Sequence, residues 1–265
     1  GRAIVGEVDD GRLALTPIHR FPNGPVKVLG SLYWDVLRLF SELRQGLALY
    51  RRDYGANLDG IALDTWGVDF ALLGRGGVLL GNPHHYRDVR TEGMLQAAFD
   101  RVPREEIFAA TGIQFMEINS LYQLLAMKMG QDPTLDQAES LLMMPDLLNY
   151  WLTGVQACEF SDATTTQFYD PRQGDWARPL LERLGLPTHL LQQIIQPGTI
   201  LGSLRAEIAD EAGLQQVPVI APACHDTGSA VAAVPARGAG FAYISSGTWS
   251  LMGIASTKPI ITPES

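Results

Sequence analysis

Residues 217–228 read VPVIAPACHDTG, and this stretch decides how the chain is interpreted. The apolar run from Val217 to Ala221 predicts a strand, and Thr227 can cap a helix over residues 228–234. Asp226 therefore stands where a strand ends and a helix begins, the place where ligands bind in open α/β sheets. The helix N-terminus favours an ionised carboxylate, so Asp226 is a candidate proton acceptor for a substrate hydroxyl. A simple helix-capping role fits the same position.

The run SSGTWS at 245–250 predicts the turn of a hairpin that extends from Phe241 to Ile254. Gly247 has no Cβ, so its backbone can approach a phosphate, and Thr248 can add a hydroxyl. Taken alone, these residues are more typical of an ordinary β-turn with glycine at a positive φ. A carboxylate base and a phosphate cradle close together suggest phosphoryl transfer to a hydroxyl.

A second polar and aromatic corner lies at residues 64–70, DTWGVDF. The carboxylates of Asp64 and Asp69, the ring of Trp66 and the bare backbone of Gly67 suit a sugar, because hydroxyls need acceptors and C–H faces pack on rings. A hairpin with a packed tryptophan is the structural alternative. The polar run DATTTQ at 162–167 is compatible with a cleft or with an ordinary loop.

The order of predicted elements favours an α/β fold, with a mixed sheet that carries helices on its faces. Strands are predicted at residues 2–8, 12–21, 58–63, 68–73 and 78–80, and helices at 32–50, 91–102, 104–110, 121–129, 146–152 and 177–184. The glycines at 238 and 240 mark the one convincing linker, which divides the chain into residues 1–237 and 238–265.

The amino-acid composition argues against several classes of function. Lys and Arg number 20 against 29 Asp and Glu, and a formal charge of −9 disfavours binding to nucleic acid or to anionic membranes. Cys158 and Cys224 form neither a disulfide framework nor a metal-ligand pattern, so we expect two reduced thiols, a cytoplasmic protein and no transition metal held by the chain. The chain begins without methionine, and we expect both ends to be cut from a longer protein.

Taken in this order, the motifs resemble the FGGY family of carbohydrate kinases, and within it the branch that acts on L-rhamnulose. The stretches that carry the resemblance are residues 18–21, 64–70, 86–88, 111–115, 121–124, 144–146, 163–167, 225–227 and 245–252. The resemblance implies two actin-like (ribonuclease H-like) ATPase domains with a cleft between them. This chain would hold the first, sugar-binding domain and the opening hairpin of the second, nucleotide-binding one.

The resemblance also assigns roles to residues. Asp226 would be the base that accepts the proton of the sugar O1 hydroxyl, with His225 and Thr227 flanking the sugar and Gly67 contacting it through its backbone. For ATP, Thr248 would bind phosphate, and Gly1-Arg2 would be the tail of the first phosphate loop. Mg²⁺ would arrive with the ATP.

The activity implied is ATP-dependent phosphorylation of L-rhamnulose to L-rhamnulose 1-phosphate in L-rhamnose breakdown. A kinase for another ketose or deoxysugar, such as L-fuculose, or a non-catalytic sugar-binding module, is the alternative. Two parts of the family pattern are missing from this sequence. They are the Asp-x-Gly start of the first phosphate loop and everything after Ser265. We therefore expect the 265-residue chain alone to have little or no activity. The sequence predicts no oligomeric state.

Overall fold

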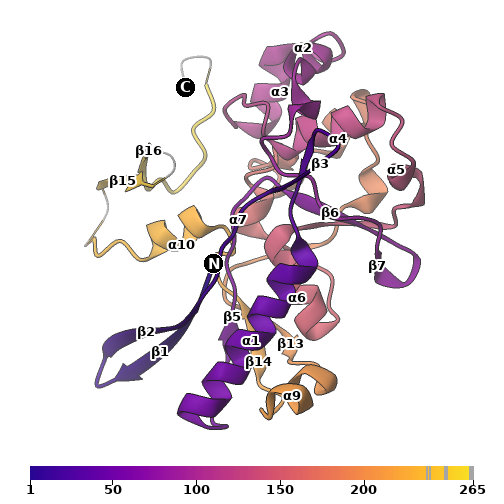
Figure 1. Cartoon of the computed structure of the whole chain (residues 1–265). Helices are drawn as coiled ribbons and strands as arrows, with labels where there is room; N and C mark the ends of the chain where they lie inside the picture. Colours follow the sequence, from indigo (N-terminus) through magenta and orange to yellow (C-terminus); the bar gives the residue numbers. More distant parts are fainter. Residues whose placement is uncertain (237, 239, 248–249, 263–265) are drawn as a thin grey trace.

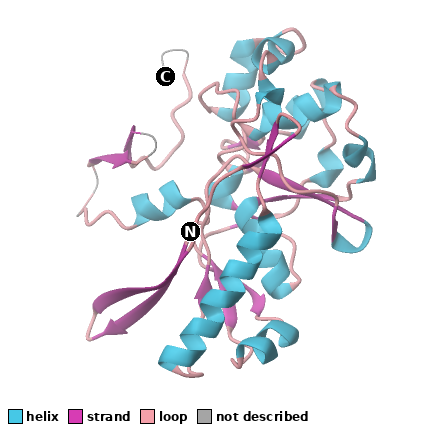
Figure 2. Ribbon diagram, in the orientation of Figure 1, coloured by secondary structure: helices cyan, strands magenta, loops and turns pink. Residues whose placement is uncertain are grey.

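The chain folds as an α/β protein in which two three-stranded sheets lie among helices (Figures 1 and 2). This computed structural model describes residues 1–236, 238, 240–247 and 250–262. In one sheet β14 (Pro218–Ala221) pairs antiparallel with β13 (Thr199–Ser203) and parallel with β5 (Ile61–Ala62). In the other, β6 (Phe70–Gly74) lies antiparallel between β7 (Val78–Leu79) and β8 (Ser140–Met143). The predicted mixed sheet is thus present as small separate sheets.

The remaining strands form two-stranded pairs. These are β1 (Arg2–Asp9) with β2 (Arg12–Arg20), β3 (Val26–Val28) with β4 (Ser31–Tyr33), β9 (Cys158–Glu159) with β12 (Ile194–Ile195), β10 (Tyr169–Asp170) with β11 (Asp175–Trp176), and β15 (Ala242–Ser246) with β16 (Ser250–Ile254). The first and last hairpins confirm the predicted pairs at the two ends of the chain. The β15–β16 hairpin lies to one side of the main body, next to the helix that begins at Asp226 (Figure 1).

The helices fill the intervals between the strands. They are α1 (Val36–Tyr54), α2 (Met94–Phe99), α3 (Arg104–Thr111), α4 (Ser120–Met129), α5 (Pro133–Gln137), α6 (Met144–Thr153), α7 (Phe160–Ala163), α8 (Arg178–Arg183), α9 (Ala206–Ala212) and α10 (Asp226–Ala232), with short 3-10 turns at Arg75–Gly77, Val89–Thr91 and Thr188–Leu190. Among the described helices, none is both long and apolar enough to span a membrane.

Several predicted boundaries were wrong, for local reasons. The helix expected from Leu32 begins at Val36, because residues 31–33 form β4 and the Asp35 carboxylate caps the helix through the N–H of Arg38. The helix expected over 91–102 is reduced to α2, since Gly93 has a φ of +76° and interrupts it. The strand expected over 58–63 pairs only at Ile61–Ala62.

The strand β6 organises the core. Its side chains alternate between two faces, as the pleat of a strand requires. Phe70 and Leu72 pack into the cluster that contains α4, whereas Ala71 and Leu73 pack into the cluster that contains the start of α1 and α6. Helices therefore cover both faces of this sheet, in agreement with the predicted layering.

Asp69, directly before β6, joins several elements through its carboxylate. Its side chain is fully buried. Oδ2 accepts N–H groups from the indoles of Trp34 (2.5 Å) and Trp66 (2.9 Å) and from the backbone of Tyr86 (3.2 Å). Oδ1 accepts from Nε2 of Gln123 at 2.9 Å. Burial raises the pKa of Asp69 to about 6, and these donors oppose the rise. Asp69 is thus a structural residue, and the hypothesis that it offers a carboxylate to a sugar was wrong.

Replacing Asp69 by Asn is expected to lower the free energy of unfolding by about 2 kcal/mol, because one amide N–H₂ must then face N–H donors in a buried site. Urea unfolding of the two proteins measures the difference. The exposed Asp53→Asn variant is the control, and its midpoint in urea should stay near that of wild type. Equal stability of Asp69→Asn and wild type would contradict this role of the carboxylate.

Candidate active site

The structure places Asp226 where the sequence predicted it, at the junction after β14. The helix α10 begins at Asp226 and His225 is its N-cap residue. The Asp226 side chain is 59% exposed. Its Oδ1 accepts the backbone N–H of Thr227 at 2.7 Å. The carboxylate is therefore ordered by its own helix turn and open to a ligand.

The corner that begins at Asp64 lies directly beside this junction. Thr65 and His225 form a parallel β-bridge: the Thr65 N–H donates to the Cys224 carbonyl at 2.9 Å, and the Asp226 N–H donates to the Thr65 carbonyl at 2.7 Å. Burial and the charge of Asp226 raise the pKa of Asp64. Two motifs far apart in the sequence thus share one site, and their two carboxylates face the same region.

Gly67 lies at a position where a side chain does not fit. A Cβ there would lie 2.7 Å from Cγ2 and 2.9 Å from Oγ1 of Thr165. The same Oγ1 accepts the N–H of Val68 at 3.0 Å, and Val68 has a φ of +67°. Thr165 in turn donates to the Asp162 carbonyl at 2.8 Å. The 162–167 run therefore packs against this corner, and Gly67, itself buried, can offer a ligand only its backbone.

His225 and Thr227 flank Asp226, as predicted. The His225 Nε2 lies 3.4 Å from Asp226 Oδ1. Burial lowers the pKa of His225, against an opposing effect of the Asp226 charge, so the ring is neutral near pH 7. The hydroxyl of Thr227 lies 3.4 Å from the same oxygen. Both side chains are half-buried. Neutral polar groups thus flank the exposed carboxylate of Asp226, an environment that suits sugar hydroxyls.

The residues predicted to bind ATP come from the two ends of the chain. Thr248 lies outside the described residues. Gly1 precedes β1, and its ammonium group donates to the Phe21 carbonyl at 2.8 Å. The positive charge of Arg2 lowers the pKa of Asp64, against the larger effect of burial, so Arg2 is within electrostatic reach of the site. The described part of the chain holds no group of three or more His, Cys, Asp or Glu side chains that could bind a metal ion.

Three buried carboxylates near the junction were not predicted. Asp146, Glu159 and Asp162 are each less than 5% exposed. Burial, and to a smaller degree the charge of Glu159, raise the pKa of Asp146 to about 8. Burial and the two neighbouring carboxylates raise the pKa of Asp162 well above its ordinary value. Acidic residues are mostly exposed in folded proteins, so no local signal in the sequence indicates this buried cluster.

The pKa of Asp146 predicts that stability falls as pH rises. The unfolded value is about 4, so between pH 4 and 8 the folded chain binds the extra proton. This contribution is complete below pH 4 and is lost as pH rises through 8, by at most about 1.4 kcal/mol per pH unit. Asp146→Asn imitates the protonated acid, so urea unfolding between pH 5 and 8.5 should show a flatter dependence in the variant. A dependence as steep as in wild type would contradict the assignment.

Comparison with known proteins decides the family. The family model for the N-terminal domain of FGGY carbohydrate kinases matches residues 34–233. The chain belongs to the FGGY family of carbohydrate kinases. The match contains α1, the corner at residues 64–70 and the His225-Asp226-Thr227 turn, so the geometry described above lies within the FGGY domain.

Relatives that match almost the whole of this chain are rhamnulokinases. The chain is 44% identical over 264 residues to a rhamnulokinase of Bacteroides thetaiotaomicron, covering 100% of this chain and 54% of the relative. It is 41% identical over 252 residues to a rhamnulokinase of Pectobacterium atrosepticum, covering 95% of this chain and 50% of the relative. The chain thus spans about half the length of the curated relatives it matches.

Solved structures support the fold. A carbohydrate kinase from Novosphingobium aromaticivorans superposes with a TM-score of 0.75 at 23% identity, covering 98% of this chain and 56% of that one. A xylulose kinase from Rhodospirillum rubrum gives a TM-score of 0.71 at 19% identity, covering 83% and 46%. The predicted actin-like FGGY kinase fold is confirmed.

Proposed function

We propose that this chain is the sugar-binding part of a kinase that transfers the γ-phosphoryl group of ATP to O1 of L-rhamnulose. The observation that carries the proposal is the parallel bridge between Thr65 and His225, which joins the Asp64–Gly67 corner to the exposed carboxylate of Asp226. The name shared by relatives at 41% to 44% identity supports L-rhamnulose as the sugar. ATP with Mg²⁺ is the second substrate, and two unpaired cysteines support a cytoplasmic location.

In this proposal Asp226 accepts the proton of the O1 hydroxyl as that oxygen attacks phosphorus. Phosphoryl transfer depends mainly on positioning and on neutralising charge, which Mg²⁺ bound to the nucleotide supplies. His225 and Thr227 would hold the neighbouring hydroxyls, and the Gly67 backbone would close the corner against the sugar. Gly1, Arg2 and Thr248 are assigned to the nucleotide phosphates. Residues 1–237 would form the sugar-binding domain, and 238–265 the start of the nucleotide-binding domain.

A ketose panel tests the substrate. The full-length gene product, with MgATP and a coupled ADP assay, should turn over L-rhamnulose with a kcat/KM at least about tenfold above that for L-fuculose or D-xylulose. A factor of about ten corresponds to the net energy of one good hydrogen bond. A preference for another ketose would show that the kinase acts on a different sugar within the same family. Heat of sugar binding without any turnover of MgATP would favour a non-catalytic sugar-binding module.

A further inference from the structure

Two side chains far from Asp226 in sequence hold the backbone that carries it. Glu159 ends β9 and Ser161 lies in the following turn of α7. Glu159 is fully buried. Its Oε2 accepts the N–H of Cys224 at 2.8 Å, the N–H of Ser161 at 3.0 Å, and the Ser161 hydroxyl. Neither residue takes part in the chemistry proposed above.

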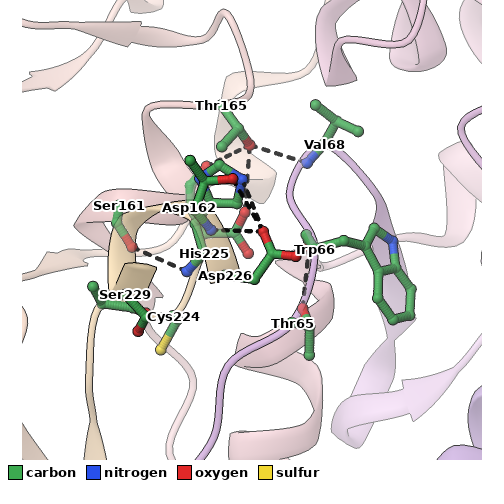
Figure 3. A network of polar contacts seen from close by, with 12 residues as sticks. Thr65, Trp66, Val68, Ser161, Asp162, Thr165, Cys224, His225, Asp226 and Ser229 are labelled. Carbon is green, nitrogen blue, oxygen red and sulfur yellow. Dashed lines mark hydrogen bonds and ion pairs between the residues drawn. The ribbon is translucent and has the colours of Figure 1, made fainter. Parts of the chain in front are cut away.

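The hydroxyl of Ser161 transmits this contact to the next peptide. A serine hydroxyl has one proton, and here it points to Glu159. Its lone pairs are then free to accept, and one accepts the N–H of His225 at 3.1 Å (Figure 3). The negative charge of Glu159 thus fixes the direction of the hydroxyl, and the hydroxyl fixes the His225 peptide.

The same serine packs closely against α10. A Cβ added to Gly228 would lie 3.1 Å from Cβ and 3.3 Å from Oγ of Ser161. On the other side, the Thr65 carbonyl accepts the N–H of Asp226. Three consecutive N–H groups, those of residues 224, 225 and 226, are therefore each held by a different partner.

We infer that Glu159 and Ser161 are positioning residues that fix the direction of the Asp226 carboxylate. This inference rests on the proposed function, in which Asp226 is the base. The carboxylate is largely exposed, and its contacts are with its own neighbours Thr227 and His225. Its direction is therefore set by the backbone from 224 to 226. Removing the Ser161 hydroxyl frees the N–H of His225, and removing the Glu159 carboxylate frees that of Cys224 and releases the Ser161 hydroxyl. Either change lets the Asp226 carboxylate turn away from O1.

Two variants in the full-length protein test the inference, with amide hydrogen exchange and steady-state kinetics as readouts. Ser161→Ala should speed exchange of the His225 amide by about tenfold, because that N–H loses its acceptor. Glu159→Ala should speed exchange of the Cys224 amide to a similar degree, and that of His225 as well, because the Ser161 hydroxyl is then free to rotate. Each should lower kcat by roughly 10- to 100-fold, the effect of a small misplacement of a catalytic group, with little change in the sugar KM. Glu159→Gln keeps one acceptor oxygen and should fall between wild type and Glu159→Ala. It also carries the test if Glu159→Ala fails to fold.

A matched control is Asp170→Asn. Asp170 is also a buried carboxylate, at 8% exposure, that accepts backbone N–H groups, here from Arg172 and Gln173. Its variant should leave both the 224–226 exchange and kcat unchanged. Unchanged exchange in Ser161→Ala and Glu159→Ala, or faster exchange with unchanged kcat, would overturn the inference. A wild-type protein that phosphorylates no ketose would instead overturn the proposed function, and the exchange data would still report on the backbone contact.

Discussion

Replacing Asp226 by Asn is expected to lower kcat for sugar phosphorylation by about 10³-fold, the usual contribution of a positioned general base. Asn keeps an oxygen that can accept the Thr227 N–H but cannot accept a proton from O1. Because the side chain is 59% exposed, the free energy of unfolding should change by less than about 0.5 kcal/mol. Steady-state kinetics and urea unfolding of the full-length protein measure the two effects, and calorimetry should find sugar binding largely intact.

The neighbouring carboxylate provides the control for this variant. Asp64 lies in the same corner, and the charge of Asp226 helps to raise its pKa. If Asp226 is the base, Asp64→Asn should keep turnover within about tenfold of wild type, a barrier change near 1.4 kcal/mol. A loss of turnover in Asp64→Asn together with normal turnover in Asp226→Asn would reverse the assignment of the base.

The second large effect is expected for Gly67→Ala. The new methyl group would lie 2.7 Å from Cγ2 of Thr165, and Thr165 also holds the N–H of Val68. The corner must shift, at a cost of about 1 to 3 kcal/mol of stability, as for other overpacked sites. Since the corner is bonded to the backbone of Asp226, kcat/KM for the sugar should fall by roughly 100-fold.

Two comparisons separate this steric effect from a general effect of replacing glycine. A Cβ at Gly81 would meet no atom within 4 Å, so Gly81→Ala should leave activity and stability unchanged. In the double variant Gly67→Ala with Thr165→Ser, the clashing Cγ2 is removed while the hydroxyl remains for Val68. Partial recovery of kcat/KM is expected there. Normal activity of Gly67→Ala alone would show that Thr165 does not restrict this corner. No recovery in the double variant would show that removing Cγ2 is not enough while Oγ1 lies 2.9 Å from the new methyl group.

Sequence reasoning was most effective where local chemistry and chain order agree. The strand-to-helix junction at Asp226 follows from the apolar run before it, and the motif series identified the family. The predicted cap at Thr227 was wrong, because α10 begins at Asp226 with His225 as its N-cap residue. Element boundaries were poorly predicted where three-residue strands or a single turn decide them. The β3–β4 hairpin and the Asp35 cap, for example, displace the start of α1. Such short elements carry too few residues for a periodic pattern.

The residues that hold the backbone of the site in place could not be predicted from the sequence. Glu159 and Ser161 contact residues more than sixty positions away, and their burial depends on how α7 packs against the Cys224 turn. The sequence around them, QACEFSDA at 156–163, mixes polar and apolar residues and gives no sign that Glu159 is buried. For Asp69 the sequence predicted a binding role that the structure does not support. Its carboxylate lies in a motif expected to bind a sugar, but it is a buried acceptor for two indole N–H groups. Long-range contact, rather than residue type, separates these roles.

A structure of the full-length protein with L-rhamnulose and a non-hydrolysable ATP analogue tests the central assignment most directly. The account predicts that O1 of the sugar lies within hydrogen-bond distance, about 2.6 to 3.2 Å, of an Asp226 carboxylate oxygen and faces the γ-phosphate. A sugar bound away from the 224–227 turn, or an O1 whose nearest carboxylate belongs to Asp64, would contradict it.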